Sequence, residues 1–360
     1  MSSLEELSGP TSPVDPSLVD TNAGEVPADR PHFAFWPKRL PRTLVLPETS
    51  LWDNLAVAAR RYPAKAATLF FGRAKPYAAL HAEALAIAGW LQAQGVRRGD
   101  RVALFMQNCP QYLVAYHGIL RADAVVVPVN AMNKAEEFGH YIVDPGTKVV
   151  ICGAELAAIV ASANAALPPS QRVARVLATR YADELPAAFE ADLAPPPAMR
   201  DWLLADPPLP AGTVRWTDAL AEARTPGPTV NGPDDLAVMP YTSGTTGLPK
   251  GCMHTHRTLM ANVIGGGAWG SGGAESVVLG VVPMFHITGM LYGVISPMFA
   301  GATVVVMPRW DRELAGRLIS RHQVSHWTCI PTMIIDLFAS PDYRSFDLTS
   351  LRWLSGGADV

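Results

Sequence analysis

The sequence contains little cysteine and little charge. Its four cysteines, Cys109, Cys152, Cys252 and Cys329, lie far apart among 360 residues and form no Cys-x-x-Cys pair. This spacing excludes a disulfide framework or a cysteine-based zinc site, and it fits a reducing, cytoplasmic setting. Charged residues make up 17% of the chain, and the formal net charge is −3. The balance of charge therefore predicts no general attraction to nucleic acid or to anionic membranes.

The N-terminus also lacks a basic patch followed by an apolar run, so no secretory signal is expected. Residues 276–308 contain no formally charged residue, which a membrane span would also show. Pro283 and Pro297 interrupt this run, and its helical part, Ile287 to Phe299, would span only about 20 Å at about 1.5 Å per residue. A bilayer core needs about 30 Å. We interpret the run as buried parallel strands and a core helix, with peripheral membrane association as the remaining possibility.

Hydrophobic residues make up 49% of the chain, enough for a large core in two or three domains. Residues 1–45 are rich in proline and predict a surface arm. Residues 46–233 read as a first α/β subdomain that ends in a proline-rich surface excursion from about 186. Residues 234–360 read as a second α/β subdomain.

Strands that alternate with helices predict βαβ units and parallel sheets. Ser50 is a candidate N-cap, Pro110 a candidate helix start, and Gly95 a candidate helix end. In the first subdomain we expect helices at 50–63, 77–94, 110–122 and 134–144, a turn followed by a strand within 98–106, and strands at 124–129 and 147–153. In the second we expect strands at 236–239, 277–282, 303–307, 325–329 and 351–354, and helices at 257–264, 287–299, 311–322 and 332–339.

The unusual segments of the second subdomain each follow one of these strands. They are YTSGTTGLPKG (241–251), PMFHITG (283–289), PRWD (308–311), PTM (331–333) and SGGA (355–358). Ligands bind beyond the carboxyl ends of the strands in open α/β sheets. We therefore expect these five loops to lie on one rim and to form one site.

The first of these loops, residues 242–250, has the composition of a phosphate-binding loop. Glycines let backbone N–H groups approach a ligand closely, and hydroxyls and a lysine add further donors and a positive charge. A Walker A loop would need Gly-Lys-Ser/Thr, which is absent here. A plain hydrophilic turn is the alternative, but it would not need this set of donors. The expected phosphate ligands are Thr242, Ser243, Gly244, Thr245, Thr246, Gly247 and Lys250.

YTSGTTGLPKG resembles the phosphate-binding motif of the adenylate-forming superfamily, which includes acyl-CoA synthetases, aryl-CoA ligases, luciferases and peptide-synthetase adenylation domains. Weaker matches run from about Ser50 to the end of the chain: RGDRVAL, VNAMNKAEEFGHYIVD, VVPMFHITGM, IPTM and LRWLSGGA. The resemblance implies an α/β fold of two stacked, flavodoxin-like, mostly parallel sheets flanked by helices.

The resemblance also implies a two-step reaction. A carboxylate attacks the α-phosphate of ATP to give acyl-AMP and pyrophosphate, and the thiol of CoA then accepts the acyl group. The loop would hold the leaving pyrophosphate, and Mg²⁺ would bridge phosphate oxygens. MNKAEEFGHYIVD is similar to the form found in medium- and long-chain fatty acyl-CoA synthetases, which favours a fatty acid over an aryl acid.

The resemblance places His286 at the wall of the acyl pocket, near the reacting carboxylate, as a catalytic and substrate-binding residue. The alternative is a core histidine with satisfied hydrogen bonds. Relatives that activate amino acids carry Asp at this position, so an amino acid substrate is not expected. Met290 lies one helical turn further, as a second wall residue or as ordinary core packing. Gly356, Gly357 and Ala358 would let the backbone lie against the acyl chain and adenine.

Two other segments carry motif-like patterns. GGGAWG (265–270) satisfies G-x-G-x-x-G, but it follows a helix and opens none, the reverse of a dinucleotide-binding motif. CMHTH (252–256) would place Cys252, His254 and His256 on one face of a strand. No fourth ligand lies nearby in the sequence, so we assign no metal ligand.

The sequence stops at Val360, before the family's Tyr-Gly-x-Thr-Glu segment, ribose-binding Asp, hinge and small C-terminal domain with its catalytic lysine. We therefore expect an incomplete large domain that forms acyl-AMP poorly on its own. The alternatives are an aryl-CoA ligase, a P-loop phosphotransferase, and a non-catalytic nucleotide- or acyl-binding module. Acyl chain length and oligomeric state do not follow from the sequence.

Overall fold

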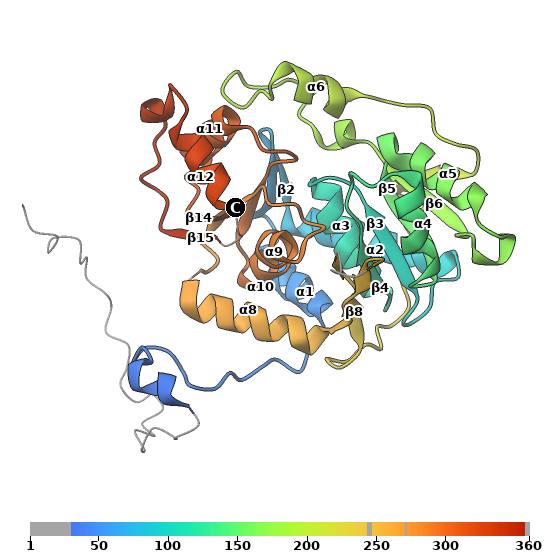
Figure 1. The fold of residues 1–360 in the computed structure, drawn as a ribbon, viewed down its shortest axis with the longest axis horizontal. Coiled ribbons are helices and arrows are strands. Elements are labelled where there is room, and N and C mark those ends of the chain that lie inside the picture. Colours follow the sequence, from blue (N-terminus) through green and yellow to red (C-terminus); the bar gives the residue numbers. More distant parts are fainter. Residues whose placement is uncertain (1–29, 243–246, 271, 357–360) are drawn as a thin grey trace, which may run out of the picture. The chain divides into compact units, whose positions relative to one another are not determined.

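The computed structural model describes residues 30–242, 247–270 and 272–356 (Figure 1). Residues 1–46 and 47–360 form two separate units. In the described part of the first unit, η2 (Pro31–Phe35) is a 3₁₀ turn, and the Trp36 indole N–H donates to the carbonyl of Leu40 at 3.0 Å. Phe33 is buried, whereas Phe35 is exposed. The expected arm therefore contains a short ordered turn.

The second unit contains two large sheets. The seven-stranded sheet has the order β11-β8-β4-β3-β5-β6-β7 and is parallel except at β11. Its strands are β3 (Arg101–Phe105), β4 (Val125–Pro128), β5 (Thr147–Gly153), β6 (Arg175–Thr179), β7 (Thr213–Arg215), β8 (Leu236–Val238) and β11 (His254–Thr255).

The six-stranded sheet has the order β15-β14-β12-β13-β1-β2, and only β2 runs antiparallel. Its strands are β1 (Ala66–Phe70), β2 (Arg73–Pro76), β12 (Val277–Gly280), β13 (Thr303–Val306), β14 (His326–Cys329) and β15 (Trp353–Gly356). A separate two-stranded ladder pairs β9 (Tyr241–Thr242) with β10 (Lys250–Gly251). The expected α/β architecture with mostly parallel sheets is confirmed.

The alternation of side chains along β3 shows how the layers are built. Val102 and Leu104 join the main core between the sheets, whereas Ala103 and Phe105 join a second core on the opposite face. The main core also contains side chains of α1 (Leu51–Arg61), α2 (Tyr77–Ala93) and α3 (Pro110–Arg121). The second core is closed by α4 (Ala135–Val143) and α5 (Ala157–Ala166), beside β5 and β6 in Figure 1.

Three helix boundaries follow the expected local chemistry. Ser50 is the N-cap of α1, where the Asp53 carboxylate accepts from the Ser50 backbone N–H at 2.9 Å and from its hydroxyl at 2.8 Å. Pro110 is the first residue of α3, where a missing N–H removes no helical hydrogen bond. After α2, Gly95 adopts a φ of +85°, which favours glycine.

The proline-rich segment 186–233 is more ordered than a surface excursion. It contains α6 (Pro197–Leu204), β7 and α7 (Trp216–Ala221), and β7 extends the seven-stranded sheet. The side chains of Leu203, Trp216 and Ala219 are buried. Prolines stand before or at the first turn of α6, where they are compatible with a helix.

Two expected helices in the second half differ in form. α8 (His256–Gly270) continues through the glycine run instead of ending at 264, because its first half packs on the core through Leu259, Met260 and Val263. The helix expected over 287–299 is divided into α9 (Ile287–Met290), a π-helical segment η6 (Leu291–Ile295) and α10 (Ser296–Ala300). α11 (Arg312–His322) and α12 (Pro331–Phe338) lie near the expected bounds.

The strands do not stay within the expected 46–233 and 234–360 ranges. β1 and β2 extend the six-stranded sheet beside β13, whereas β8 and β11 extend the seven-stranded sheet beside β4. The five strands that precede the predicted site loops therefore lie in two sheets, so the expected single rim is wrong for β8. The division into subdomains stays a prediction.

Candidate functional site

The predicted phosphate loop begins and ends on the β9–β10 ladder. Thr242 pairs with Lys250 across this ladder, and both side chains are exposed. Gly247 has a φ of +153°, a conformation that side chains disfavour. Ser243, Gly244, Thr245 and Thr246 lie outside the described residues. The described ends of the loop thus bring one hydroxyl and one ammonium group to neighbouring positions.

Helix α4 supports the base of this loop, which sequence reasoning did not predict. The Nε2 atom of His140 lies 2.7 Å from the carbonyl oxygen of Pro249, and its ring packs edge-on against Tyr241 at 5.6 Å. The Tyr241 hydroxyl donates to the Asp144 carboxylate. Burial, and then this hydrogen bond, raise the pKa of Tyr241. His140 and Asp144 stand four residues apart, so one helical face supplies both contacts.

His286 lies at the end of the loop that follows β12. It is the N-cap of α9, and its Nδ1 accepts from the backbone N–H of Thr288 at 3.3 Å. Its side chain is exposed, so His286 is not a buried core histidine. Met290 closes the same short helix and is fully buried. The roles of His286 and Met290 toward an acid stay predictions.

Gly356 is the last residue of β15, and Gly357 and Ala358 lie outside the described residues. A Cβ at Gly356 would lie 2.5 Å from the carbonyl oxygen of Cys329 on β14. Glycine is therefore required here for strand packing, whatever its role toward a ligand. The adjacent Ser355 hydroxyl lies 2.9 Å from that of Thr328.

The remaining loops of the six-stranded sheet have packing roles. Trp310, in PRWD, stacks on Trp327 with ring centres 5.7 Å apart and donates to the Asp336 carboxylate at 2.7 Å. Asp311 caps α11 by accepting from the N–H of Leu314 at 2.8 Å. PTM forms the first turn of α12.

The histidines of CMHTH do not share one environment. His256 is buried, and its Nδ1 accepts from the N–H of Leu51 at 2.9 Å, which anchors the start of α1. Burial lowers the pKa of His256 to about 4. Cys252 is exposed. Across the described ranges, no cluster of three His, Cys, Asp or Glu side chains could hold a metal ion.

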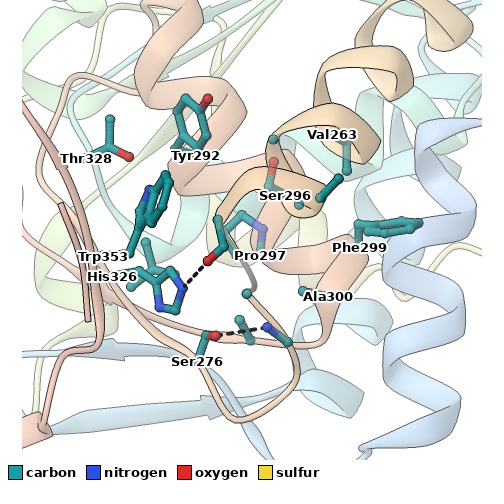
Figure 2. Close-up of a pocket in the computed structure, with 18 of the residues that line it drawn as sticks. Val263, Ser276, Tyr292, Ser296, Pro297, Phe299, Ala300, His326, Thr328 and Trp353 are labelled. Atoms are coloured by element: carbon teal, nitrogen blue, oxygen red, sulfur yellow. Dashed lines mark hydrogen bonds between the residues drawn. The ribbon is translucent and has the colours of Figure 1, made fainter. Parts of the chain in front are cut away.

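An apolar cavity of about 330 Å³ lies between α8, the η6–α10 segment and the strands β12, β14 and β15. Figure 2 shows Tyr292 and Thr328 toward one end of the cavity and Ser276 toward the other, with Trp353 and His326 on one wall. Tyr292 and Thr328 also line a small hollow that is bounded by Thr288 and Gly289 beside His286. The cavity and this hollow therefore share a wall near the His286 segment.

The glycine run GGGAWG forms part of the cavity wall. Gly266, Gly267 and Gly270 line it from α8. A Cβ at Gly266 would lie 3.7 Å from the Tyr292 ring, in ordinary contact, and one at Gly267 would meet no atom within 4 Å. These glycines leave space that larger side chains would fill. Sequence analysis missed this role because it read the run for nucleotide binding alone, although the run continues helix α8.

Comparison with known proteins assigns the family. The family model described as AMP-binding enzyme matches residues 55–360. The chain belongs to the AMP-binding enzyme family. Two AMP-binding relatives are a long-chain-fatty-acid–CoA ligase of Bacillus subtilis (strain 168), 30% identical, and a feruloyl-CoA synthase of Amycolatopsis sp., 32% identical. The matches cover 92% and 84% of this chain but only 59% and 53% of those relatives.

The fold also matches that of solved AMP-binding enzymes. The N-terminal domain of FACL13 from Mycobacterium tuberculosis superimposes with a TM-score of 0.71 and 26% identity, over 86% of this chain and 70% of that one. The two largely parallel sheets flanked by helices are thus those of the N-terminal domain of adenylate-forming enzymes. Within the described ranges, no helix has the length and apolar character needed to span a bilayer.

Proposed function

We propose that this chain supplies the ATP- and acid-binding part of an AMP-forming acyl-CoA synthetase. The parent enzyme converts a carboxylic acid and ATP into acyl-AMP and pyrophosphate and then transfers the acyl group to CoA. The observation that carries the proposal is an apolar cavity that shares Tyr292 and Thr328 with a small hollow beside the His286 segment, in a chain of the AMP-binding enzyme family. An apolar cavity near a nucleotide-binding loop suits an acid with an apolar body and a charged end.

The size of the cavity supports a fatty acid as the substrate. At about 30 Å³ for each group, the volume that one water molecule takes in the liquid, the cavity holds about ten groups of methylene size. This capacity suits a medium-chain acid, or the first part of a longer one that leaves through the open side. The fatty-acid ligase relative from B. subtilis supports the same class.

In the proposed first step, the residues of the chain mainly position the reactants. Lys250 and the loop hydroxyls hold the leaving pyrophosphate, and His286 lies at the wall near the reacting carboxylate. Gly356, Gly357 and Ala358 give the backbone close access to adenine and acyl chain, and Met290 supports the acyl wall from the core. Positioning and charge neutralisation provide most of the catalysis in such a step. Mg²⁺ would be held together with ATP beside the loop hydroxyls, such as that of Thr242, and it would supply positive charge that stabilises the leaving pyrophosphate.

An aryl acid is the second candidate. The feruloyl-CoA synthase relative is 32% identical, and the rings of Tyr292 and Trp353 line the cavity. Aromatic walls also suit an aromatic substrate, because aromatic rings attract one another. Competition between dodecanoate and ferulate in one assay would separate these two candidates.

Acid-dependent exchange of radiolabelled pyrophosphate into ATP tests the proposal in the complete gene product. Exchange should require the acid, and Lys250→Ala combined with Thr245→Ala should reduce kcat/KM for ATP by about 100-fold, as expected when charge-assisted contacts are lost. Exchange that does not change in this double variant would overturn the loop assignment. The 360-residue chain alone should support little exchange.

Substitutions at Gly266 test the cavity. Gly266→Ala should change little, whereas Gly266→Leu should fill the cavity and shift the preference to acids shorter by about three or four carbons. Rates measured with acids of 6 to 16 carbons on all three proteins would show the shift. An unchanged chain-length profile in Gly266→Leu would remove the cavity from the proposal.

A further inference from the structure

The segment that carries His286, residues 281–286, is held from the other sheet. We call this segment the His286 loop. It follows β12 of the six-stranded sheet, but the two polar groups of the Met284 peptide are bound by residues that follow β3 of the seven-stranded sheet. The Met284 N–H donates to Asn108 Oδ1 at 2.8 Å, and the Tyr112 hydroxyl donates to the Met284 carbonyl at 2.9 Å.

Asn108 is the centre of these contacts. Its side chain is buried, and Nδ2 lies 3.1–3.3 Å from four backbone carbonyl oxygens at the ends of β12 and β13, those of Gly280, Val281, Val282 and Met307. An amide NH₂ group has two protons, so the four oxygens share them. One side chain thus fixes the carboxyl ends of two strands and the start of the His286 loop together.

Tyr112 adds a contact that can be removed without changing packing. It lies on α3 and is fully buried, as is Tyr116 one turn further along the same helix. Burial raises the pKa of the Tyr112 phenol far above its usual value, so the hydroxyl stays a donor at all working pH values. The Tyr116 hydroxyl has no hydrogen-bond partner among the described residues. The two tyrosines form a pair on one helix, and only the hydroxyl of Tyr112 makes a hydrogen bond to the loop.

The opposite side of the His286 loop is equally confined. A Cβ at Gly289 would lie 2.1 Å from the carbonyl oxygen of Pro283, so α9 packs directly on the loop backbone. Only Phe285 separates Met284 from His286, and His286 is the N-cap of α9. The backbone position of His286 therefore depends on how the N–H and C=O groups of Met284 are held.

We propose that Asn108 and Tyr112 are positioning residues that hold His286 in place for activation of the acid. They lie outside the predicted phosphate and acyl sites and act through the backbone of Met284. Through these two residues, the seven-stranded sheet sets the geometry of the His286 loop, which follows a strand of the six-stranded sheet. The seven-stranded sheet also carries β8, the strand that precedes the predicted phosphate loop. This inference rests on the proposed function of the His286 loop.

The test compares Tyr112→Phe with Tyr116→Phe. Each variant loses one buried hydroxyl from α3, but only the first loses a contact to the loop. Amide hydrogen exchange of the 281–290 peptides, measured in the 360-residue chain, should become about fivefold faster in Tyr112→Phe and stay unchanged in Tyr116→Phe, as expected for the loss of one hydrogen bond. Equal exchange in the two variants would overturn the proposal.

Kinetics in the complete gene product give the functional readout. In Tyr112→Phe, kcat/KM for the acid should fall about fivefold in pyrophosphate exchange, while the KM for ATP stays within twofold, because the phosphate loop is not touched. Asn108→Asp places a carboxylate against four carbonyl oxygens and should cause a larger loss of the same kind, and Asn108→Ser, which keeps a small donor, should retain more activity than Asn108→Asp.

The outcomes separate this inference from the proposed function. Faster amide hydrogen exchange in the His286 loop, together with a fall in kcat/KM for the acid but not for ATP, supports the positioning role. Faster amide hydrogen exchange in the loop, with unchanged kinetics for both the acid and ATP, would overturn the role of Asn108 and Tyr112 in the reaction. An unmodified gene product that shows no acid-dependent pyrophosphate exchange would overturn the proposed function instead. The hydrogen-exchange comparison would still decide whether Tyr112 holds the loop.

Discussion

The His286 loop and the phosphate loop follow strands of different sheets and are anchored at different depths. The His286 loop is held by Asn108 and Tyr112, both fully or almost fully buried. The base of the predicted phosphate loop is held by His140 on α4, which is half-buried, and by Asp144 at the C-cap of this helix, which is exposed. A buried polar contact costs more to break, because the partner left behind cannot bind water. The comparison therefore predicts a rigid acid side and a weaker anchor on the nucleotide side.

The largest effect is expected from a steric clash beside the buried His286 loop. Gly289→Ala places a Cβ against the carbonyl oxygens of Pro283 and Val282, and we expect it to lower the free energy of unfolding by about 3 kcal/mol. Gly293→Ala, four residues on, is the matched control, because its Cβ would meet the Met284 side chain and the Gly280 Cα at 3.6–3.9 Å, which is ordinary van der Waals contact. Urea unfolding of both variants measures the difference. Similar stabilities would show that the His286 loop has room to move.

The next largest effect is expected at His256, in the segment that follows the predicted phosphate loop. Burial lowers the pKa of His256 to about 4 from a usual 6.5. The unfolded chain therefore binds this proton first, and stability falls as the pH decreases from about 6.5 to about 4. His256→Asn retains a side-chain acceptor for the Leu51 N–H but cannot titrate in this range.

Between about pH 4 and 6.5, the free energy of unfolding of this variant should change less steeply with pH than that of the unmodified chain, by up to about 1.4 kcal/mol per pH unit. Denaturation midpoints at pH 4.5, 5.5, 6.5 and 7.5 would show it. Parallel pH profiles for the two proteins would mean that His256 is charged in the folded state or that its contact to Leu51 is not formed.

A smaller effect is expected at the surface anchor. His140→Phe keeps the ring packing against Tyr241 and removes the contact to the Pro249 carbonyl. Stability should change by about 1 kcal/mol or less, and the KM for ATP should rise about fivefold with little change in the KM for the acid. Together with Tyr112→Phe this gives opposite selectivities. A rise in the acid KM instead would contradict the separation of the two loops.

The smallest effect is expected at Cys252. Its side chain is exposed, and Cys252→Ser should change stability by less than about 0.5 kcal/mol. Added zinc should not raise the melting temperature of the unmodified chain more than that of the variant. A zinc-dependent difference would revive a metal site at CMHTH and add a second anchor to the phosphate loop.

Local sequence patterns predicted most of the helices and strands whose signals lie within the element itself. The helix that starts at Pro110, the capped start of α1 at Ser50 and the β-rich runs of the uncharged segment all occur as expected. Their signals are short-range: a missing N–H, a capping carboxylate, an alternating apolar run. The β1–β2 hairpin escaped notice because its second strand, RAKP, has no apolar alternation and is defined only by its partner.

The candidate site was predicted in part. Motifs pointed to residues 242–250 and to His286, whose roles stay predictions, whereas no motif pointed to His140, Asn108 or the cavity wall at Gly266. Asn108 carries no local sign of its role, because all of its backbone partners lie more than 170 residues away. GGGAWG was misjudged because glycine weakens a helix locally by about 1 kcal/mol each, and tertiary packing of the first half of α8 overrides that preference.

The sequence by itself determined the family and the βαβ order of the chain, because these depend on neighbouring residues and on short spacings. Only the tertiary structure decided which strands share a sheet, because strand pairing joins segments that are distant in the chain and depends on which faces can be buried together. For the same reason it alone revealed the cavity, and the buried amide of Asn108 that ties the two sheets beside His286.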